Sequence, residues 1–172
     1  MTAELIGIGT DLVDLDRFRT VLERTPRIVP RLFTDGEQAY ACGRRDPTEP
    51  LGARFAAKEA AMKALGVGIG EVDFHDLEVV RLDSGAPVLR VHGRASERAT
   101  VLGIDRWMVT LSHTAHLAQA VVVALGYDGG DPERGGDAVS DEEVGEMTQR
   151  VIRRALANQL VASKLGPRRR DP

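Results

Sequence analysis

Charged side chains on one alanine-rich segment are the first candidates for chemistry in this chain of 172 residues. Glu59 and Lys63 stand four residues apart within it. A helix would aim this carboxylate and this cation rigidly at a charged ligand, but the same spacing also suits an ordinary helical ion pair worth roughly 0.2–0.5 kcal/mol. Asp11 follows an apolar segment that contains Gly7 and Gly9. Its carboxylate suits either a ligand contact or the cap of the next helix.

The segment that carries Glu59 and Lys63 is expected to be a central helix of about four turns. Strong helix formers dominate residues 51–65, Pro50 stands just ahead of them, and Gly66 follows where a left-handed cap would end the helix. Large apolar residues share one face, and alanines cover the opposite one. Both broad faces are suited to burial, so the helix is expected to lie at the centre of the fold.

Composition predicts one ordinary soluble domain with a hydrophobic core. The chain is 42% hydrophobic and 28% charged, with a net charge of −3 and a pI of about 5.8. This balance gives no global electrostatic argument for binding nucleic acid. A lone cysteine, Cys42, excludes an intramolecular disulfide and argues against a zinc cluster. No signal peptide or long apolar span is recognisable, so we expect a cytoplasmic protein that does not enter a membrane.

One basic neighbourhood stands out in this acidic chain. The apolar spacing predicts a helix over about residues 13–24, which places Arg17 and Arg24 seven residues apart on one face, with Arg27 nearby. Gly7 and Gly9, in the strand expected before this helix, allow another backbone to approach closely. The basic residues suit either a solvated face or a dock for an acidic partner.

The segments around the central helix predict a small antiparallel sheet and further short helices. Thr34 and Glu37 have capping-box spacing, so a helix is expected over about residues 34–42. Strands are expected at about 72–82, 88–91, 106–113 and 117–125, with a short helix at 94–102. Backbone amides of the alternating glycines, Gly66 and Gly68 among them, suit either phosphate oxygens or a helix cap with a turn.

The link between the last two expected strands contains polar side chains at a hairpin bend. Ser112, His113 and Thr114 favour a turn, but a loop on a rigid hairpin is also a common place for ligand contacts. Beyond this hairpin the composition changes. We predict one folded domain over residues 1–126, a flexible linker over 127–139, and an amphipathic helix with a basic tail over 140–172.

Three stretches taken together resemble one known family. They are residues 7–17 (GIGTDLVDLDR), residues 54–63 (RFAAKEAAMK) and the Ser-His-Thr run at 112–114. Their order and spacing resemble the holo-acyl-carrier-protein synthase family of 4'-phosphopantetheinyl transferases, over roughly residues 5–125. The resemblance implies an α+β fold in which a small antiparallel sheet wraps around the central helix.

The resemblance also implies an activity. Members transfer the 4'-phosphopantetheine arm from coenzyme A to a serine of apo acyl carrier protein, release adenosine 3',5'-bisphosphate and depend on Mg²⁺. Transferred to this chain, the resemblance makes Asp11 and Glu59 the metal ligands, with Glu59 also a candidate for the general base. Lys63 would stabilise the leaving phosphate. The coenzyme contacts implied are Arg54, Lys58, Gly66, Gly68, Ser112, His113 and Thr114.

The partners implied by the resemblance are an acyl carrier protein of fatty-acid or polyketide biosynthesis and two further copies of the chain. Arg17, Arg24 and Arg27 would meet the acidic carrier protein, and the hairpin with His113 would act on a neighbour's site in a homotrimer. Two other functions use the same residues. A magnesium-dependent phosphohydrolase would pass the phosphate to water, and a catalytically silent module would bind carrier proteins through its arginines.

Overall fold

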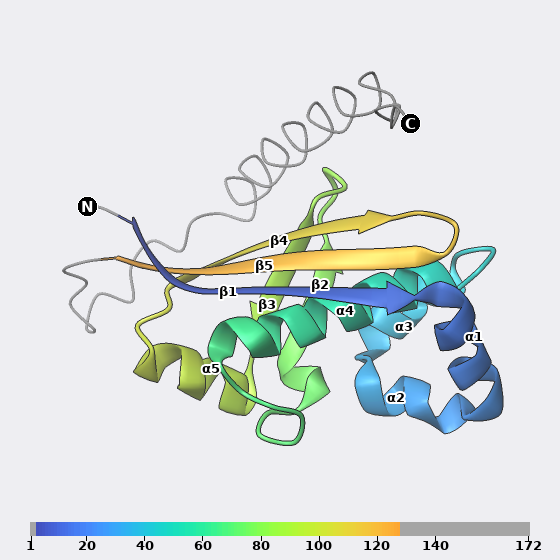
Figure 1. The fold of residues 1–172 in the computed structure, drawn as a ribbon, viewed down its shortest axis with the longest axis horizontal. Helices are drawn as coiled ribbons and strands as arrows, with labels where there is room; N and C mark the ends of the chain where they lie inside the picture. The colour runs from blue at the N-terminus through green and yellow to red at the C-terminus, as the bar shows by residue number, and fades with distance from the viewer. Residues whose placement is uncertain (1–2, 128–172) are drawn as a thin grey trace, which may run out of the picture.

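A computed structural model of the chain describes residues 3–127. It contains five strands, five α-helices and two 3₁₀ helices within that range (Figure 1). In chain order these elements are β1 (Ala3–Asp14), α1 (Leu15–Arg24), η1 (Pro26–Ile28), α2 (Val29–Leu32), α3 (Asp35–Cys42), α4 (Thr48–Leu65), η2 (Phe74–Asp76), β2 (Leu77–Arg81), β3 (Pro87–Val91), α5 (Gly93–Val101), β4 (Arg106–His113) and β5 (Leu117–Tyr127).

Helix α4 lies at the centre, and both of its broad faces are buried, as predicted. It starts at Thr48, three residues earlier than expected. Pro50 lies inside the first turn, where a backbone N–H has no intrahelical partner, so its missing N–H is tolerated. Gly66 ends the helix in the left-handed conformation, with φ of 66°. Its buried apolar side chains are Leu51, Ala53, Ala56, Ala57, Ala60, Ala61, Met62, Ala64 and Leu65.

A three-stranded antiparallel sheet with the order β1-β5-β4 packs along α4 (Figure 1). The central strand pairs Val123 with Ile8 of β1 and with Met108 of β4. The predicted close approach of β1 to α4 is confirmed, because a Cβ atom on Gly7 or Gly9 would collide with a backbone carbonyl of α4. Glycine therefore sets the depth at which β1 sits on the helix.

The second sheet is the β2–β3 hairpin, which is shorter than predicted. The strand expected at 72–82 is confined to β2 because the residues before it form the 3₁₀ helix η2. Asp73 caps η2 by accepting a hydrogen bond from the His75 N–H, and Asp76 completes a capping box. These local side-chain hydrogen bonds compete with the strand conformation.

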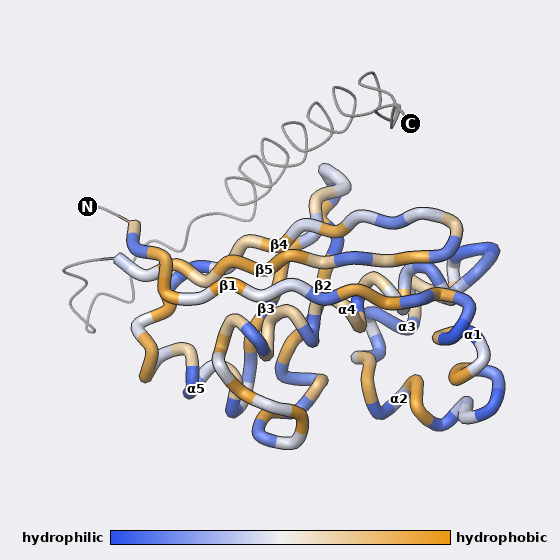
Figure 2. Tube along the Cα trace, viewed as in Figure 1, coloured by the Kyte–Doolittle hydropathy of each residue, from blue (hydrophilic) through white to orange (hydrophobic). Residues whose placement is uncertain are grey.

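The outward face of the three-stranded sheet is apolar. Leu5, Ile8 and Leu12 are exposed by 57%, 61% and 57%, and Ile8 is paired with the half-buried Val123. An irregularity in the β1–β5 register between Leu5 and Gly7 brings Leu5 and Ile8, three residues apart, to the same face. Figure 2 shows this hydrophobic colouring along β1 and β5.

The structure confirms the predicted fold class, a mixed fold in which a small antiparallel sheet packs around a central helix. Tyr127 is the last residue of β5, so the strand runs one residue past the predicted domain end. The rest of the predicted linker and the predicted helix and tail at 140–172 lie outside the described residues. Within residues 3–127, no helix has the length and apolarity needed to cross a membrane.

Candidate active site

Strand β1 brings Asp11 against α4, as the ligand hypothesis requires. Lys63 Nζ donates to Asp11 Oδ1 at 2.9 Å and to the Thr10 carbonyl at 2.8 Å. The strand continues through Asp14, so Asp11 does not lie at the strand's end. The capping alternative for Asp11 is wrong: Asp14 caps α1, accepting a hydrogen bond from the Arg17 N–H at 2.9 Å.

Glu59 is held near this pair with one oxygen unsatisfied. Its Oε1 atom is buried and has no hydrogen-bond partner. Burial raises the pKa of Glu59, the charge of Asp11 raises it further, and Lys63 lowers it. A buried carboxylate oxygen without a donor is costly unless a cation meets it. The helical ion-pair alternative is therefore not what the structure shows, because Lys63 pairs with Asp11.

The two carboxylates fit a magnesium ion by their chemistry. Mg²⁺ is bound through one or two carboxylates together with substrate phosphates and water. Asp11 and Glu59 supply that donor set, and the unsatisfied Glu59 oxygen gives it an acceptor with no competing donor. Across residues 3–127 no group of three or more His, Cys, Asp or Glu side chains is placed to hold a metal. The metal ligands that Mg²⁺ needs beyond these two carboxylates would therefore have to come from the phosphates of a bound ligand and from water.

A hollow of about 470 Å³ beside this pair is lined by Lys63 and Gly66 and by the start of β1. Gly66 is exposed and has room around its Cα. The N–H of Gly68 already donates to Glu71 Oε1 at 2.7 Å, so a phosphate would have to displace that carboxylate. The structure therefore places Gly66 beside the hollow and gives Gly68 a partner of its own.

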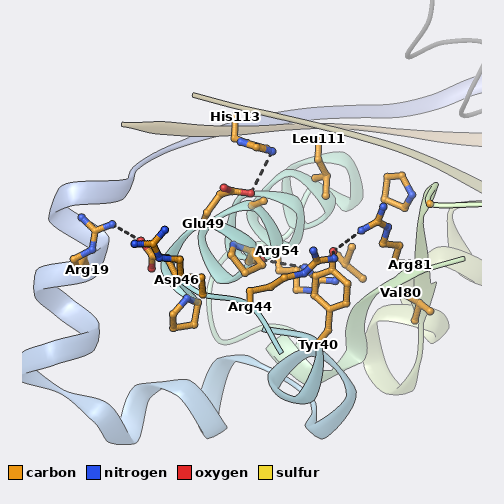
Figure 3. Close-up of a pocket in the computed structure, with 17 residues that line it drawn as sticks. Arg19, Tyr40, Arg44, Asp46, Glu49, Arg54, Val80, Arg81, Leu111 and His113 are labelled. Atoms are coloured by element: carbon orange, nitrogen blue, oxygen red, sulfur yellow. Dashed lines mark hydrogen bonds and ion pairs between the residues drawn. The ribbon is translucent and has the colours of Figure 1, made fainter. Parts of the chain in front are cut away.

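A larger cavity of about 870 Å³ lies beside the first half of α4, where Glu49, Pro50, Ala53 and Arg54 line it (Figure 3). Arg54 lines it and is only 5% exposed. Its Nη1 donates to the Pro50 carbonyl at 3.1 Å, but its buried Nε has no hydrogen-bond partner. Burial lowers the pKa of Arg54. Nine residues separate Arg54 from Lys63, which is a rotation of about 180° around the helix.

The hairpin between β4 and β5 reaches the same cavity through His113. Its Nε2 atom lies 3.2 Å from Glu49 Oε1 near the start of α4 (Figure 3). Ser112 is exposed beside it. Thr114 Oγ1 accepts the N–H groups of His116 and Leu117, so this hydroxyl stabilises the turn, and Thr114 does not line the cavity.

Lys58 points into the core and does not reach either cavity. It is fully buried, and its Nζ lies 2.7 Å from Glu37 Oε2 and donates to the Phe74 carbonyl at 2.7 Å. Glu37, itself 1% exposed, also accepts the N–H groups of Thr34 and Val79. The predicted contact between Lys58 and a coenzyme phosphate would require Lys58 to leave these two buried partners.

Residues outside the predicted set also line the larger cavity. The Tyr40 hydroxyl accepts hydrogen bonds from Arg44 Nη2 at 2.8 Å and Arg81 Nη1 at 2.9 Å. Burial would raise the pKa of Tyr40, but the hydrogen bonds and charges of Arg81 and Arg44 lower it overall. These residues come from three separate segments without a shared local pattern, so sequence reasoning gave no signal for them.

The basic residues predicted to dock a partner are all on the surface. Arg17 is on α1, Arg24 ends it, and Arg27 lies in η1. All three are exposed, and among the described residues none of them forms an ion pair. Arg19 differs, because it is paired with Asp16 at 3.2 Å and Asp46 at 2.7 Å.

The fold and this site define a class of protein. The sequence profile described as the 4'-phosphopantetheinyl transferase superfamily matches residues 7–121. A holo-[acyl-carrier-protein] synthase from Streptomyces avermitilis is 50% identical over 122 residues, which are 71% of this chain and 98% of the relative. The chain therefore belongs to the holo-[acyl-carrier-protein] synthases of this superfamily.

Solved structures agree with this assignment. A holo-(acyl-carrier-protein) synthase from Bacillus anthracis, described in complex with CoA (3',5'-ADP), is 34% identical with a TM-score of 0.61; the match covers 72% of this chain and 98% of that one. A holo-[acyl-carrier-protein] synthase from Helicobacter pylori in complex with coenzyme A is 30% identical with a TM-score of 0.60. That match covers 68% of this chain and 98% of the other.

Proposed function

We propose that this chain transfers the 4'-phosphopantetheine group of coenzyme A to a serine of an apo acyl carrier protein. The products are holo acyl carrier protein and adenosine 3',5'-bisphosphate. The observation that carries the proposal is the meeting of Asp11, Glu59 and Lys63 between β1 and α4, in a chain that belongs to this family. The coenzyme complexes of two related proteins support coenzyme A as the donor.

Asp11 and Glu59 are the residues that would hold Mg²⁺, and they fit it by charge and by the unsatisfied Glu59 oxygen. When bound, the ion would neutralise charge on the pyrophosphate of coenzyme A. Lys63 is placed to stabilise the phosphate that leaves with adenosine 3',5'-bisphosphate, which requires it to exchange part of its contact with Asp11. The magnesium dependence belongs to this proposal.

The proton of the carrier serine goes to Glu59, directly or through a water. The serine oxygen forms a bond to the phosphorus that bears the pantetheine arm, and the bond from that phosphorus to the oxygen of adenosine 3',5'-bisphosphate breaks. The pKa of Glu59 is raised by burial and by Asp11 in the metal-free protein, and a bound cation would lower it again, so the acceptor role is proposed from the position of Glu59 beside Asp11 and Lys63.

The active assembly we propose is a homotrimer with sites between protomers. Two features support it. Lys63 and Arg54 lie about 180° apart around α4 and line different cavities, so a coenzyme bound across two copies could meet one of these cations from each. The apolar outward face of the sheet, with Ile8 near its middle, would be covered by such contacts. Native mass spectrometry tests this: the wild type should be trimeric, and Ile8→Asp should shift it to smaller species with lower transfer.

The carrier protein would dock on Arg17, Arg24 and Arg27, which are exposed. Arg17 lies in the first turn of α1, Arg24 is its last residue, and Arg27 lies in η1. An acidic partner surface would be steered to this basic face. A role in supplying holo carrier protein for fatty-acid biosynthesis follows from the proposed reaction, and polyketide carriers remain a second possible class of substrate. The cytoplasmic location stays a prediction.

Intact mass spectrometry of a purified apo acyl carrier protein tests the reaction. With the protein, coenzyme A and magnesium, the carrier should gain about 340 Da, the mass of the phosphopantetheine arm. A chelator and the Glu59→Ala variant should each prevent the gain. Release of phosphate without any carrier would favour the phosphohydrolase instead. Carrier binding that survives Glu59→Ala, with no mass gain even in the wild type, would favour the silent module.

A further inference from the structure

The larger cavity holds a cluster of arginines arranged around one phenol. Arg44 and Arg81 both donate to the Tyr40 hydroxyl, at 2.8 and 2.9 Å. The Cζ atom of Arg54 lies 4.1 Å from the centre of the Tyr40 ring, and that of Arg44 lies 4.8 Å from it. Figure 3 shows the four side chains converging on the cavity from α3, the segment after it, α4 and the end of β2. We call Tyr40, Arg44, Arg54 and Arg81 the tyrosine–arginine cluster.

The charges of this cluster are not neutralised within the described part of the chain. None of its three arginines forms an ion pair with a carboxylate there. The two carboxylates that line the cavity are already engaged, Asp46 with Arg19 and Glu49 with His113. Arg54 adds a buried Nε with no hydrogen-bond partner. Three guanidinium groups with spare donors around one hollow suit a doubly charged phosphomonoester, whose oxygens accept paired N–H donors.

We propose that Tyr40 is a positioning residue, whose hydroxyl and ring fix the guanidinium groups of Arg44, Arg54 and Arg81 so that they bind the 3'-phosphomonoester of coenzyme A. This inference rests on the proposed function for its choice of ligand. Coenzyme A carries that phosphate as its one monoester, and the pyrophosphate linkage has none. A neutral hydroxyl that accepts from two arginines holds them in place without cancelling their charge, whereas a carboxylate in the same position would cancel it.

The hydroxyl is the part of Tyr40 that can be removed alone. In the full-length chain, Tyr40→Phe keeps the ring beneath Arg54 and frees Arg44 and Arg81 to move. We expect KM for coenzyme A to rise about tenfold with kcat little changed, because hydrogen bonds to charged groups carry that much binding. KM for 3'-dephospho-coenzyme A, which lacks the monoester, should stay within about twofold of the wild-type value. Arg81→Met should produce the same selective loss.

The matched control is Tyr127→Phe. Tyr127 also lies beside an arginine, with Arg106 Cζ 5.4 Å from its ring centre, but it does not line the cavity. It should leave the ratio of the two KM values unchanged. An equal rise of both KM values in Tyr40→Phe, or no rise in either, would overturn the inference. So would a wild-type enzyme that uses both coenzymes equally well, although the proposed function would then stand.

A binding measurement separates the inference from the proposed function. Calorimetry should show that the wild type binds adenosine 3',5'-bisphosphate more tightly than adenosine 5'-monophosphate, and that Tyr40→Phe removes most of this preference. If that preference is found in a protein that transfers nothing to any carrier, the phosphate site stands and the proposed reaction fails. If the wild type shows no preference, the inference fails whatever the transfer assay gives.

Discussion

Replacing Lys58 by methionine tests whether this lysine belongs to the core or to the coenzyme site. Its ammonium is fully buried, lies 2.7 Å from Glu37 Oε2 and donates to the Phe74 carbonyl. Lys58→Met would leave the Glu37 carboxylate buried with only the N–H groups of Thr34 and Val79. Removing one partner of a buried pair costs about 3–5 kcal/mol. For a chain of this length that is a fall in Tm of roughly 10 °C.

The matched control is the same substitution at Lys63, five residues further along α4. Lys63 is 52% exposed in its pair with Asp11, so Lys63→Met should cost at most about 1 kcal/mol of stability. Its effect should instead fall on the reaction, with kcat lowered by about 100-fold or more. Lys58→Met should show the opposite pattern, with KM for coenzyme A within about twofold of the wild-type value.

Thermal or urea unfolding gives the stability of both variants, and the mass-gain assay gives their kinetics. Burial lowers the pKa of Lys58 despite the charge of Glu37, so the attraction of Glu37 does not fully offset the desolvation of this ammonium. The double variant Glu37→Leu/Lys58→Met should therefore lose less stability than the sum of the two single variants. A stability loss below about 1 kcal/mol in Lys58→Met, together with a tenfold rise in KM for coenzyme A, would refute the core assignment.

Three further outcomes are expected. Glu59→Gln should abolish magnesium-dependent transfer and should raise Tm at pH 7 in the absence of metal. The reason is that burial and Asp11 raise the pKa of Glu59, so the contribution of this carboxyl to stability is present below about pH 4.3 and is lost as pH rises through its folded-state pKa. Equal Tm values for the variant and the wild type at pH 7 would contradict this. Gly9→Ala should cost more than about 2 kcal/mol and slow transfer, because its Cβ would collide with the Ala60 carbonyl; a stable, active variant would show that β1 can shift. Arg17→Glu should raise KM for the carrier protein about tenfold and leave KM for coenzyme A unchanged, whereas the same change at the exposed Arg94 of α5 should alter neither; equal rises for carrier and coenzyme in Arg17→Glu would argue against docking.

The fold could be predicted largely because the central helix has a clear local sequence pattern. Alanines occupy one face of α4 and large apolar residues the opposite face, and this pattern is typical of a helix that is buried on both faces. The helix start was missed because a proline within the first turn looks the same in sequence as a proline ahead of the helix. The strand predicted at 72–82 was wrong over its first residues, because short capping side chains turn the backbone there into the 3₁₀ helix η2.

The candidate site was predictable only where its residues lie in recognisable motifs. The meeting of Asp11 with Lys63 follows from two stretches that resemble the family. The burial of Lys58 could not be predicted from these stretches, because the capping box that the structure confirms already explained the presence of its partner Glu37. Glu37 Oε2 accepts the Thr34 N–H in the capping box of α3 and also pairs with Lys58 in the core, while Oε1 accepts the Val79 N–H. Sequence spacing shows the first of these roles and is silent on the second.

Helix α4 explains why the charged residues of this chain divide into separate groups. Because both broad faces are buried, each charge on the helix must find a partner in the core or border a cavity. Lys58 has a partner in the core, whereas Arg54 and Lys63 each border a cavity. A ligand that uses both of those cations has to reach two cavities, which is one reason why we propose a site shared between copies of the chain. The same burial makes the helix a rigid support for Glu59, and the homotrimer that we propose would bring cations from two copies of α4 to one coenzyme.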